Sequence, residues 1–150
     1  MHCDDITQIR IAEGTYSPHP EVARNHSFTL REGVQIYGGF QGNEISIAER
    51  VYNACPTVLS GDIGVYNNAS DNLYHVLTIL SGAIPVILDG ITVEDGLANG
   101  SNPDQQTGSG IFNSGKLHCN NVILLSNSAP ALYNAPGSEL VANGLIEVRN

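Results

Sequence analysis

Residues 108–134 read GSGIFNSGKLHCNNVILLSNSAPALYN, and this stretch decides the fold because it holds one pattern and the start of its repeat. GIFN at 110–113 returns as ALYN at 131–134, and LHCNNVILLSN from Leu117 returns as LVANGLIEVRN from Leu140. Each repeat combines an apolar run, a polar step that contains asparagine, and a turn. Such self-similarity predicts a solenoid, in which each repeat packs on the next.

The same pattern extends toward the N-terminus. LDGITVEDG from Leu88 matches CNNVILLSN from Cys119, and PTVLSG from Pro56 matches PVILDG from Pro85. The repeats recur at intervals of about 23–31 residues. We attribute the unequal intervals to loops of different length around a constant core.

Short β-type runs, each stopped by Gly, Asn, Asp or Pro, make up most of the chain. They read IRIAEG, SFTLREG, VQIYGGF, PTVLSGDI, HVLTILSG, PVILDGITVEDG, KLHCNNVILLSN and ELVANGLIEVRN. One window, NEISIAERV at 43–51, has helical spacing, and a loop with a single helical turn explains it equally well. The sequence therefore predicts an all-β protein, a single-stranded parallel β-helix with one domain over residues 1–150 and long loops in its N-terminal half.

Stacking of successive coils places equivalent residues in columns. A turn column is predicted to contain Asp89 and Gly90, then Asn120 and Asn121, then Asn143 and Gly144, with Ser60 and Gly61 before them. Gly and Asn tolerate the positive φ of a sharp turn, and stacked Asn side chains can hydrogen-bond along the column. A second column is predicted from Asn127 and Asn150.

The interior of the coils is predicted to be filled by one apolar column. Its members are Leu59, Leu88 and Leu117, then Ile91, Val122 and Leu145. Cys3, Cys55 and Cys119 are odd in number and widely spaced, and they form no metal-binding or redox pair. Cys119 stands where Ala142 stands in the next repeat, so we expect a small buried filler.

The charge balance excludes some partners. Six Lys and Arg stand against 15 Asp and Glu, a net charge of −9, which argues against binding to a phosphate backbone. Charged residues make up only 14% of the chain, so neutral polar side chains provide its solubility, as is common in secreted β-rich proteins. No apolar stretch approaches the length of a membrane span.

A family resemblance rests on several motifs in a fixed order between about Ile9 and Ala129. The motifs are IRIAEGTYSP, SFTLREGVQIYGGFQGNE, PTVLSGDIG, VILDGITVEDGLANG, GSGIFNSG and CNNVILLSNSA. In these the chain resembles the right-handed parallel β-helix proteins of bacterial surfaces, of the choice-of-anchor type, with repeats akin to those of polymorphic outer-membrane proteins. The resemblance implies a right-handed solenoid and an extracellular or cell-surface location, reached through a C-terminal sorting or anchoring segment.

Departures from that pattern concern the ends. No signal peptide, N-terminal cap or C-terminal anchor is visible, so we expect the chain to be part of a longer protein. Glu147 stands where Leu124 stands one repeat earlier, which predicts a shifted register or a frayed open end. An open end could pair head to tail with another copy, giving a homo-oligomer through the coil ends.

Acidic residues near strand ends are the candidates for chemistry: Asp62, Asp71, Asp89, Glu94, Asp95 and Asp104. Asp89 belongs to the turn column and is interpreted as structural. Glu94 and Asp95 would point to opposite faces if their strand continued, so they do not form an acid/base pair for glycan chemistry. The loops from Ser60 to Asn72 and from Glu94 to Asp104 are rich in oxygen atoms that could bind Ca²⁺, or they are unliganded polar loops.

The histidine and aromatic residues do not define a site by their spacing. The histidines, which show no metal-ligand spacing, are His2, His19, His26, His75 and His118. The first half of the chain concentrates aromatic residues that either line a carbohydrate groove or pack the first coils and loops: Tyr16, Tyr37, Phe40, Tyr52, Tyr66 and Tyr74.

The sequence thus favours a non-enzymatic, adhesin-like structural module that displays loops for binding glycans or surface proteins and that self-assembles end to end. The competing hypothesis is a polysaccharide-active enzyme, a lyase or glycoside hydrolase or a fragment of one, with Asp62, Asp71 and Asp95 as ligands or acids. No catalytic residue is assigned, and calcium is the one cofactor considered.

Overall fold

The computed structural model describes residues 7–19, 21–128 and 130–148. This part of the chain is all-β, with three short 3₁₀ helices and no α-helix. The strands are β1 (Gln8–Ala12), β2 (Gly14–Tyr16), β3 (Phe28–Leu30), β4 (Gln35–Phe40), β5 (Thr57–Ser60), β6 (Leu77–Ile79), β7 (Val86–Asp89), β8 (Ile91–Glu94), β9 (Ile111–Asn113), β10 (Lys116–Leu125), β11 (Leu132–Asn134) and β12 (Glu139–Val148). The 3₁₀ helices are η2 (Ile47–Glu49), η3 (Ala69–Asp71) and η4 (Pro103–Gln106).

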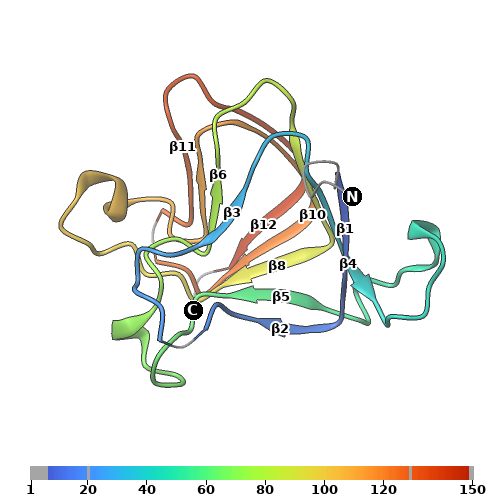
Figure 1. Ribbon diagram of the computed structural model, residues 1–150, viewed down its shortest axis with the longest axis horizontal. Helices are drawn as coiled ribbons and strands as arrows, with labels where there is room; N and C mark the ends of the chain where they lie inside the picture. The colour runs from blue at the N-terminus through green and yellow to red at the C-terminus, as the bar shows by residue number, and fades with distance from the viewer. Residues whose placement is uncertain (1–6, 20, 129, 149–150) are drawn as a thin grey trace.

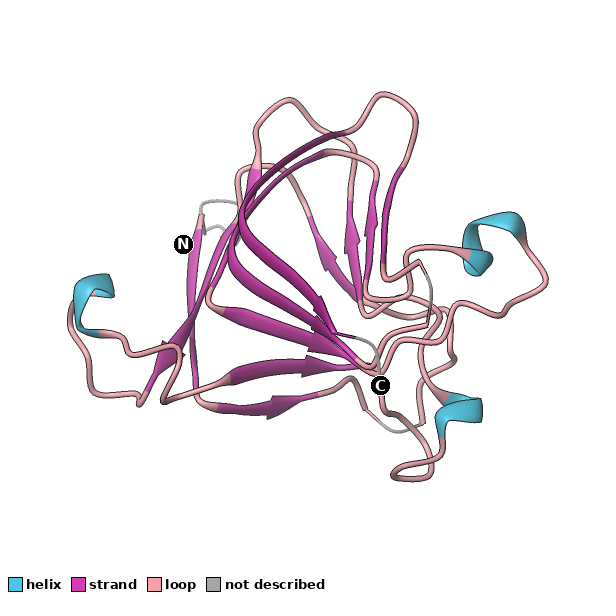
Figure 2. Ribbon diagram, turned by 180° about the vertical axis from the view of Figure 1, so that it is seen from behind, coloured by secondary structure: helices cyan, strands magenta, loops and turns pink. Residues whose placement is uncertain are grey.

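The strands surround one core on three faces, and the chain passes through the faces in turn (Figures 1 and 2). The first face contains β1, β4, β7 and the N-terminal parts of β10 and β12. The second face contains β2, β5, β8 and the C-terminal parts of β10 and β12. The third face is the four-stranded sheet β11-β9-β6-β3. The pairs between described strands are parallel, so the predicted all-β, parallel architecture is confirmed.

A turn at Asn121 separates the first face from the second. Asn121 has a φ of 50°, and the neighbouring repeats place Gly90 (φ 69°) and Gly144 (φ 84°) at the same step. Asn121 donates from Nδ2 to Asp89 Oδ1 at 3.4 Å, and Asn143 donates from Nδ2 to Asn120 Oδ1 at 3.3 Å. The predicted turn column is therefore confirmed over these three repeats.

The earlier member of this column was predicted wrongly. Ser60 pairs with Glu94 on the second face, whereas the residue paired with Asp89 on the preceding strand is Tyr37. The predicted match of Pro56 with Pro85 fails for the same reason. A proline precedes and a glycine follows both β5 and β7. The two segments therefore have similar sequences although their strands lie on different faces.

The long loops make the N-terminal repeats longer than the sequence indicates. Ile36 on β4 pairs with Leu88 on β7, an interval well beyond 31 residues. The loops that contain η2 and η3 both lie within this interval. On the first face the spacing of 23–31 residues holds from β7 onward, where Cys119 pairs with Leu88 and then with Ala142.

The predicted interior residues are buried. The part of the predicted column from Val122 to Leu145 is confirmed by their pairing, but Leu59, Leu88 and Leu117 do not pair with one another. Leu117 pairs with Val86, and Leu59 pairs with Val93. Each lies in the core, together with Leu77, Ile79, Leu88, Ile91, Ile111, Val122 and Leu124, and Leu145 packs partly buried against them. Inward-pointing apolar side chains from three faces thus form a single core.

Cys119 is the small buried residue that the sequence predicted. Burial raises the pKa of its thiol to about 12, so it remains protonated at neutral pH. Cys55 is also buried and free, and Cys3 lies outside the described residues.

The repeat that begins within residues 108–134 is reproduced in the strand pairing. Phe112 pairs with Tyr133, and β10 pairs with β12 from Lys116 to Leu125. Leu124 faces Glu147 in this register, so the predicted register shift at Glu147 is wrong. Strand β12 is largely exposed because the described chain places no further strand beside it. Asn150, the predicted partner of Asn127, lies outside the described residues.

The shortest elements agree only in part with the sequence prediction. The window at 43–51 forms the single helical turn η2, whose first turn is capped by Ser46 Oγ accepting from the Ala48 amide at 3.2 Å. The β-type runs did not identify β2, β9 or β11 as strands, each of which has three residues.

None of the helices in the described ranges has the length and apolar character needed to cross a membrane.

Candidate functional site

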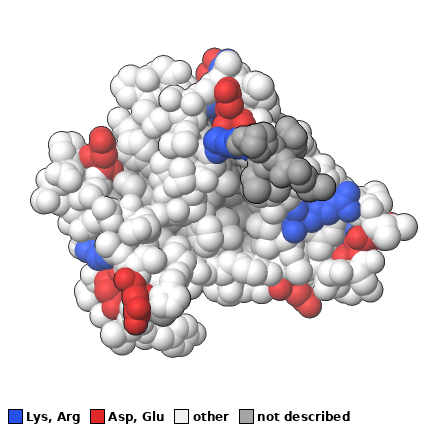
Figure 3. Space-filling model, viewed as in Figure 1, with Lys and Arg blue, Asp and Glu red and all other residues white. Residues whose placement is uncertain are grey.

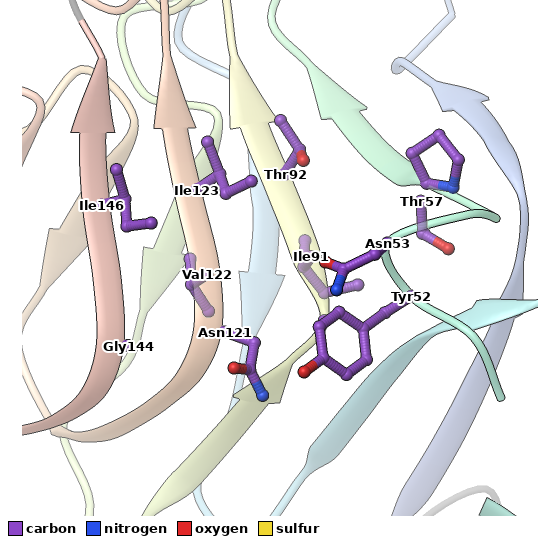
Figure 4. Close-up of a pocket in the computed structure, with 12 residues that line it drawn as sticks. Tyr52, Asn53, Thr57, Ile91, Thr92, Asn121, Val122, Ile123, Gly144 and Ile146 are labelled. Carbon is purple, nitrogen blue, oxygen red and sulfur yellow. The ribbon is translucent and has the colours of Figure 1, made fainter.

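A groove of about 210 Å³ runs across the outer side of the second face (Figure 4). The loop before β5 forms one wall, and β8, β10 and β12 form the floor. The lining residues are Tyr52, Asn53, Pro56, Thr57, Gly90, Ile91, Thr92, Asn121, Val122, Ile123, Gly144 and Ile146. Apart from the phenol of Tyr52, none of these side chains is ionisable, so the groove is neutral.

The floor repeats from strand to strand. Thr92 pairs with Ile123, and Ile123 pairs with Ile146, so three outward side chains lie in register across β8, β10 and β12. Ile123 is 37% exposed and Ile146 is 56% exposed. Neighbouring parallel strands lie about 4.8 Å apart, which gives a flat strip of small and apolar groups.

The wall is held close to the sheet by a glycine in the IYGGF motif. The Val51 amide donates to the Gly39 carbonyl at 2.9 Å, and the Cys55 amide donates to the Val51 carbonyl at 2.9 Å. Gly39 has a φ of +88°, and a Cβ at this position would lie 2.4 Å from Tyr52 Cα. Only glycine therefore allows the loop to approach here.

Arg50 fixes the base of the wall. Its guanidinium lies 2.7 Å from the Asp89 carboxylate, and both side chains are largely buried. The guanidinium also lies 5.3 Å from the centre of the Tyr37 ring and 5.6 Å from that of Tyr52. Contact with Arg50 on one side orients the Tyr52 ring beside the groove.

The groove combines the groups that recognise uncharged sugars. Figure 4 shows the Tyr52 ring next to the amides of Asn53 and Asn121. Aromatic rings present a flat apolar surface, and amides and hydroxyls both donate and accept hydrogen bonds. The Thr57 hydroxyl is not available to a ligand, because it already accepts a hydrogen bond from the Gly39 amide at 3.0 Å. The available polar groups are therefore those of Tyr52, Asn53 and Thr92.

The acidic residues form a second cluster, at the end of β8. Strand β8 ends at Glu94, and Asp95 follows in the left-handed region with a φ of 60°. The strand does not continue past Glu94, so the condition under which these two side chains were expected to point to opposite faces is not met. Burial, and then the nearby charges of Asp95 and Asp62, raise the pKa of Glu94. Burial and the charge of Asp62 likewise raise the pKa of Asp95, opposed by a hydrogen bond from Ser60.

The raised pKa of Glu94 predicts how stability changes with pH. A carboxyl whose pKa is raised by folding contributes stability below its unfolded value of 4.5, and this contribution is lost as the pH rises through the folded value. The Glu94→Gln variant lacks this titration. We therefore expect thermal melts to show wild type losing stability relative to Glu94→Gln as the pH rises from 4.5 toward 7.

The control for this comparison is Glu21→Gln, which removes a carboxylate from an exposed loop position outside the cluster. A difference between wild type and Glu94→Gln that stays constant with pH would contradict the electrostatic account of this cluster.

The other sequence candidates lie apart from this cluster or have structural roles. Asp89 forms the ion pair with Arg50, in agreement with its structural interpretation. Asp104 is exposed on η4, where its charge acts on His75 rather than on Glu94. Asp71 ends η3 in the loop that begins at Ser60. Within the described ranges, no three residues among His, Cys, Asp and Glu are grouped so as to hold a metal ion.

Among the aromatic residues that the sequence singled out, Tyr52 lines this groove and Tyr16 lines a separate apolar pocket. Tyr66 is 83% exposed at the tip of another loop, and Tyr74 stacks at 4.2 Å on Arg24. A pair that the sequence did not lead us to expect lies on the third face, where the rings of Phe112 and Tyr133 are 5.2 Å apart. The matching segments GIFN and ALYN contain the signal that predicts this pair, because equivalent residues of paired strands lie side by side.

Charged side chains are few on the face of the molecule that Figure 3 shows. Figure 3 shows that most of the visible face is uncharged, with acidic side chains gathered near the loop between β5 and β6.

Comparison of the chain with protein-family models, with curated proteins and with solved structures finds no match.

Proposed function

We propose that this chain is a right-handed parallel β-helix that serves as a binding module outside the cell or on its surface. Support for the β-helix comes from the parallel pairing of each strand with its counterpart in the next repeat and from the order in which the chain visits the three faces. Right-handed crossovers are the strongly preferred hand for parallel strands. The extracellular location rests on the resemblance to choice-of-anchor β-helix proteins and on the low content of charged residues.

The function that the groove supports best is non-catalytic binding of a neutral glycan. One observation carries this proposal: Tyr52 and Asn53 stand beside a flat strip of Thr92, Ile123 and Ile146, with no charged side chain in the lining. Sugar rings would stack on the tyrosine while their hydroxyls bond to the amide and threonine groups. The net charge of −9 disfavours acidic polysaccharides through long-range repulsion.

Replacing Tyr52 with alanine tests the groove. On columns of immobilised neutral and acidic polysaccharides, we expect wild type to be retained on a neutral one and Tyr52→Ala to bind it at least about tenfold more weakly, about 1.4 kcal/mol. Tyr66→Ala is the matched control, because it removes an exposed ring from a different loop. Asn53→Ala, at an exposed position in the same wall, tests the site with less disturbance of the fold.

Circular dichroism establishes that each variant is folded before binding is compared. Equal retention of wild type, Tyr52→Ala and Asn53→Ala would contradict the groove as the binding site. Absence of retention on every glycan would contradict the glycan as the ligand.

A polysaccharide-active enzyme is the second candidate, favoured by the raised pKa values of Glu94 and Asp95. Asp95 lines a cavity of about 280 Å³ beside Asn72 and Ser126. A raised pKa favours the protonated form of a carboxyl, which is the form that acts as a general acid. In this case sugar would be released from the bound polysaccharide, and Asp62→Asn with Asp95→Asn would abolish the release while retention stays intact.

A further inference from the structure

We propose that the loop between β5 and β6 is a calcium site, and that the Oδ1 atoms of Asp62, Asp71 and Asn72 are among its ligands. This site lies apart from the glycan groove and shares none of its residues. Its test requires no glycan, so its outcome is independent of the proposed function.

The loop closes on itself. The Leu73 amide donates to the Gly61 carbonyl at 3.0 Å, which brings the two ends of the loop together. Asp62 follows one end directly, and Asp71 and Asn72 precede the other. Closure therefore brings the backbone at Asp62 near the backbone at Asp71 and Asn72, which the sequence separates from it.

Both carboxylates of the loop use one oxygen to hold the turn between them. Asp62 Oδ2 accepts from the Asn67 amide at 3.0 Å, and Asp71 Oδ2 accepts from the Val65 amide at 2.9 Å. The second oxygen of each carboxylate, Oδ1, is inaccessible to solvent and has no hydrogen-bond donor. Two negatively charged groups thus converge on the same turn with one unsatisfied oxygen each.

Asn72 supplies the independent observation that points to a ligand. The residue is only 6% exposed, and its Nδ2 donates to the Asp95 carbonyl at 2.7 Å. This bond fixes the amide, and Oδ1 on its other side is buried without a donor. Asn72 and Asp95 both line the cavity of about 280 Å³. A buried acceptor without a partner is costly, so native structures satisfy it with a donor or an ion.

The donor set matches calcium. Carboxylate, amide and carbonyl oxygens are the ligands of Ca²⁺, which takes about six to eight of them in flexible geometry. The closed segment from Gly61 to Leu73 contains no Cys or His, whose thiolate and imidazole groups transition metals prefer.

Titration of the chelator-treated protein with CaCl₂ by calorimetry tests the site. We expect a dissociation constant of about 10⁻⁴–10⁻³ M, the range of extracellular calcium modules. Terbium, which replaces calcium, is expected to luminesce on excitation of tyrosine, because Tyr66 lies within the loop. Asp62→Asn and Asp71→Asn should each weaken binding at least about tenfold, because each removes a charged ligand.

Asp104→Asn is the matched control, since it makes the same change on exposed η4. If it weakened calcium binding as much as Asp62→Asn, diffuse surface charge would explain the binding and the site would be overturned. Absence of any heat or luminescence with wild type would also overturn it and would leave water as the partner of the buried oxygens. If Asp62→Asn or Asp71→Asn does not fold, hydrogen exchange of the wild-type Val65 and Asn67 amides decides: slower exchange with calcium supports the site, and unchanged exchange overturns it.

Discussion

Replacing Arg50 with alanine is expected to lower the free energy of unfolding by about 3–5 kcal/mol. The substitution leaves the largely buried Asp89 carboxylate without its cation. It also removes the group that contacts the rings of Tyr37 and Tyr52 and donates to the Gly38 and Asp89 carbonyls. Urea denaturation, followed by circular dichroism, measures the change.

The matched control is the pair of Lys116 with Glu139, which joins β10 to β12 at the surface. Its atoms approach to 3.0 Å, but the side chains are 35% and 63% exposed. Lys116→Ala is therefore expected to cost at most about 1 kcal/mol. If both substitutions had equal effects, burial would not be the cause of the Arg50 result.

Asn127→Ala is expected to lower the free energy of unfolding by about 2–5 kcal/mol, because it leaves two buried backbone groups unpaired. Asn127 Oδ1 accepts from the Gly96 amide at 2.9 Å, and Nδ2 donates to the Val93 carbonyl at 2.8 Å. Water cannot replace the side chain readily, since both of these hydrogen bonds are buried. The same denaturation experiment measures this effect.

Asn102→Ala provides the comparison for Asn127→Ala. Asn102 precedes η4 at an exposed position, and its side chain makes no capping hydrogen bond. We expect a change within about 0.5 kcal/mol. A similarly small change for Asn127→Ala would mean that the backbone near Gly96 finds other partners without cost.

The parts of the fold that the sequence predicts are those set by local chemistry. The step at Asn121 requires a positive φ, so Asn or Gly must recur there, and the pattern is visible without coordinates. Small and apolar residues recur at Cys119 and Ala142 because paired strands place them side by side. The repeats after β7 were therefore aligned correctly.

The parts that the sequence does not predict depend on contacts between distant segments. The pairing of β5 with β8 could not be predicted, because long loops separate the two strands and the sequence around Pro56 is more similar to that before β7, which lies on another face. The ion-pair partner of Asp89 is Arg50, and the repeat pattern does not predict this pair because Arg50 lies in a loop rather than on a neighbouring strand. The end of β8 before Asp95 was not visible in the sequence, because Asp95 adopts a left-handed conformation and no glycine marks the position.

The register of the groove floor sets a length scale for whatever lies along it. Thr92, Ile123 and Ile146 recur once per strand, so a polymer that crosses the strands meets an equivalent contact about every 4.8 Å. Affinity should increase with each added unit of a linear ligand until the ligand spans β8 to β12, and further units should add nothing.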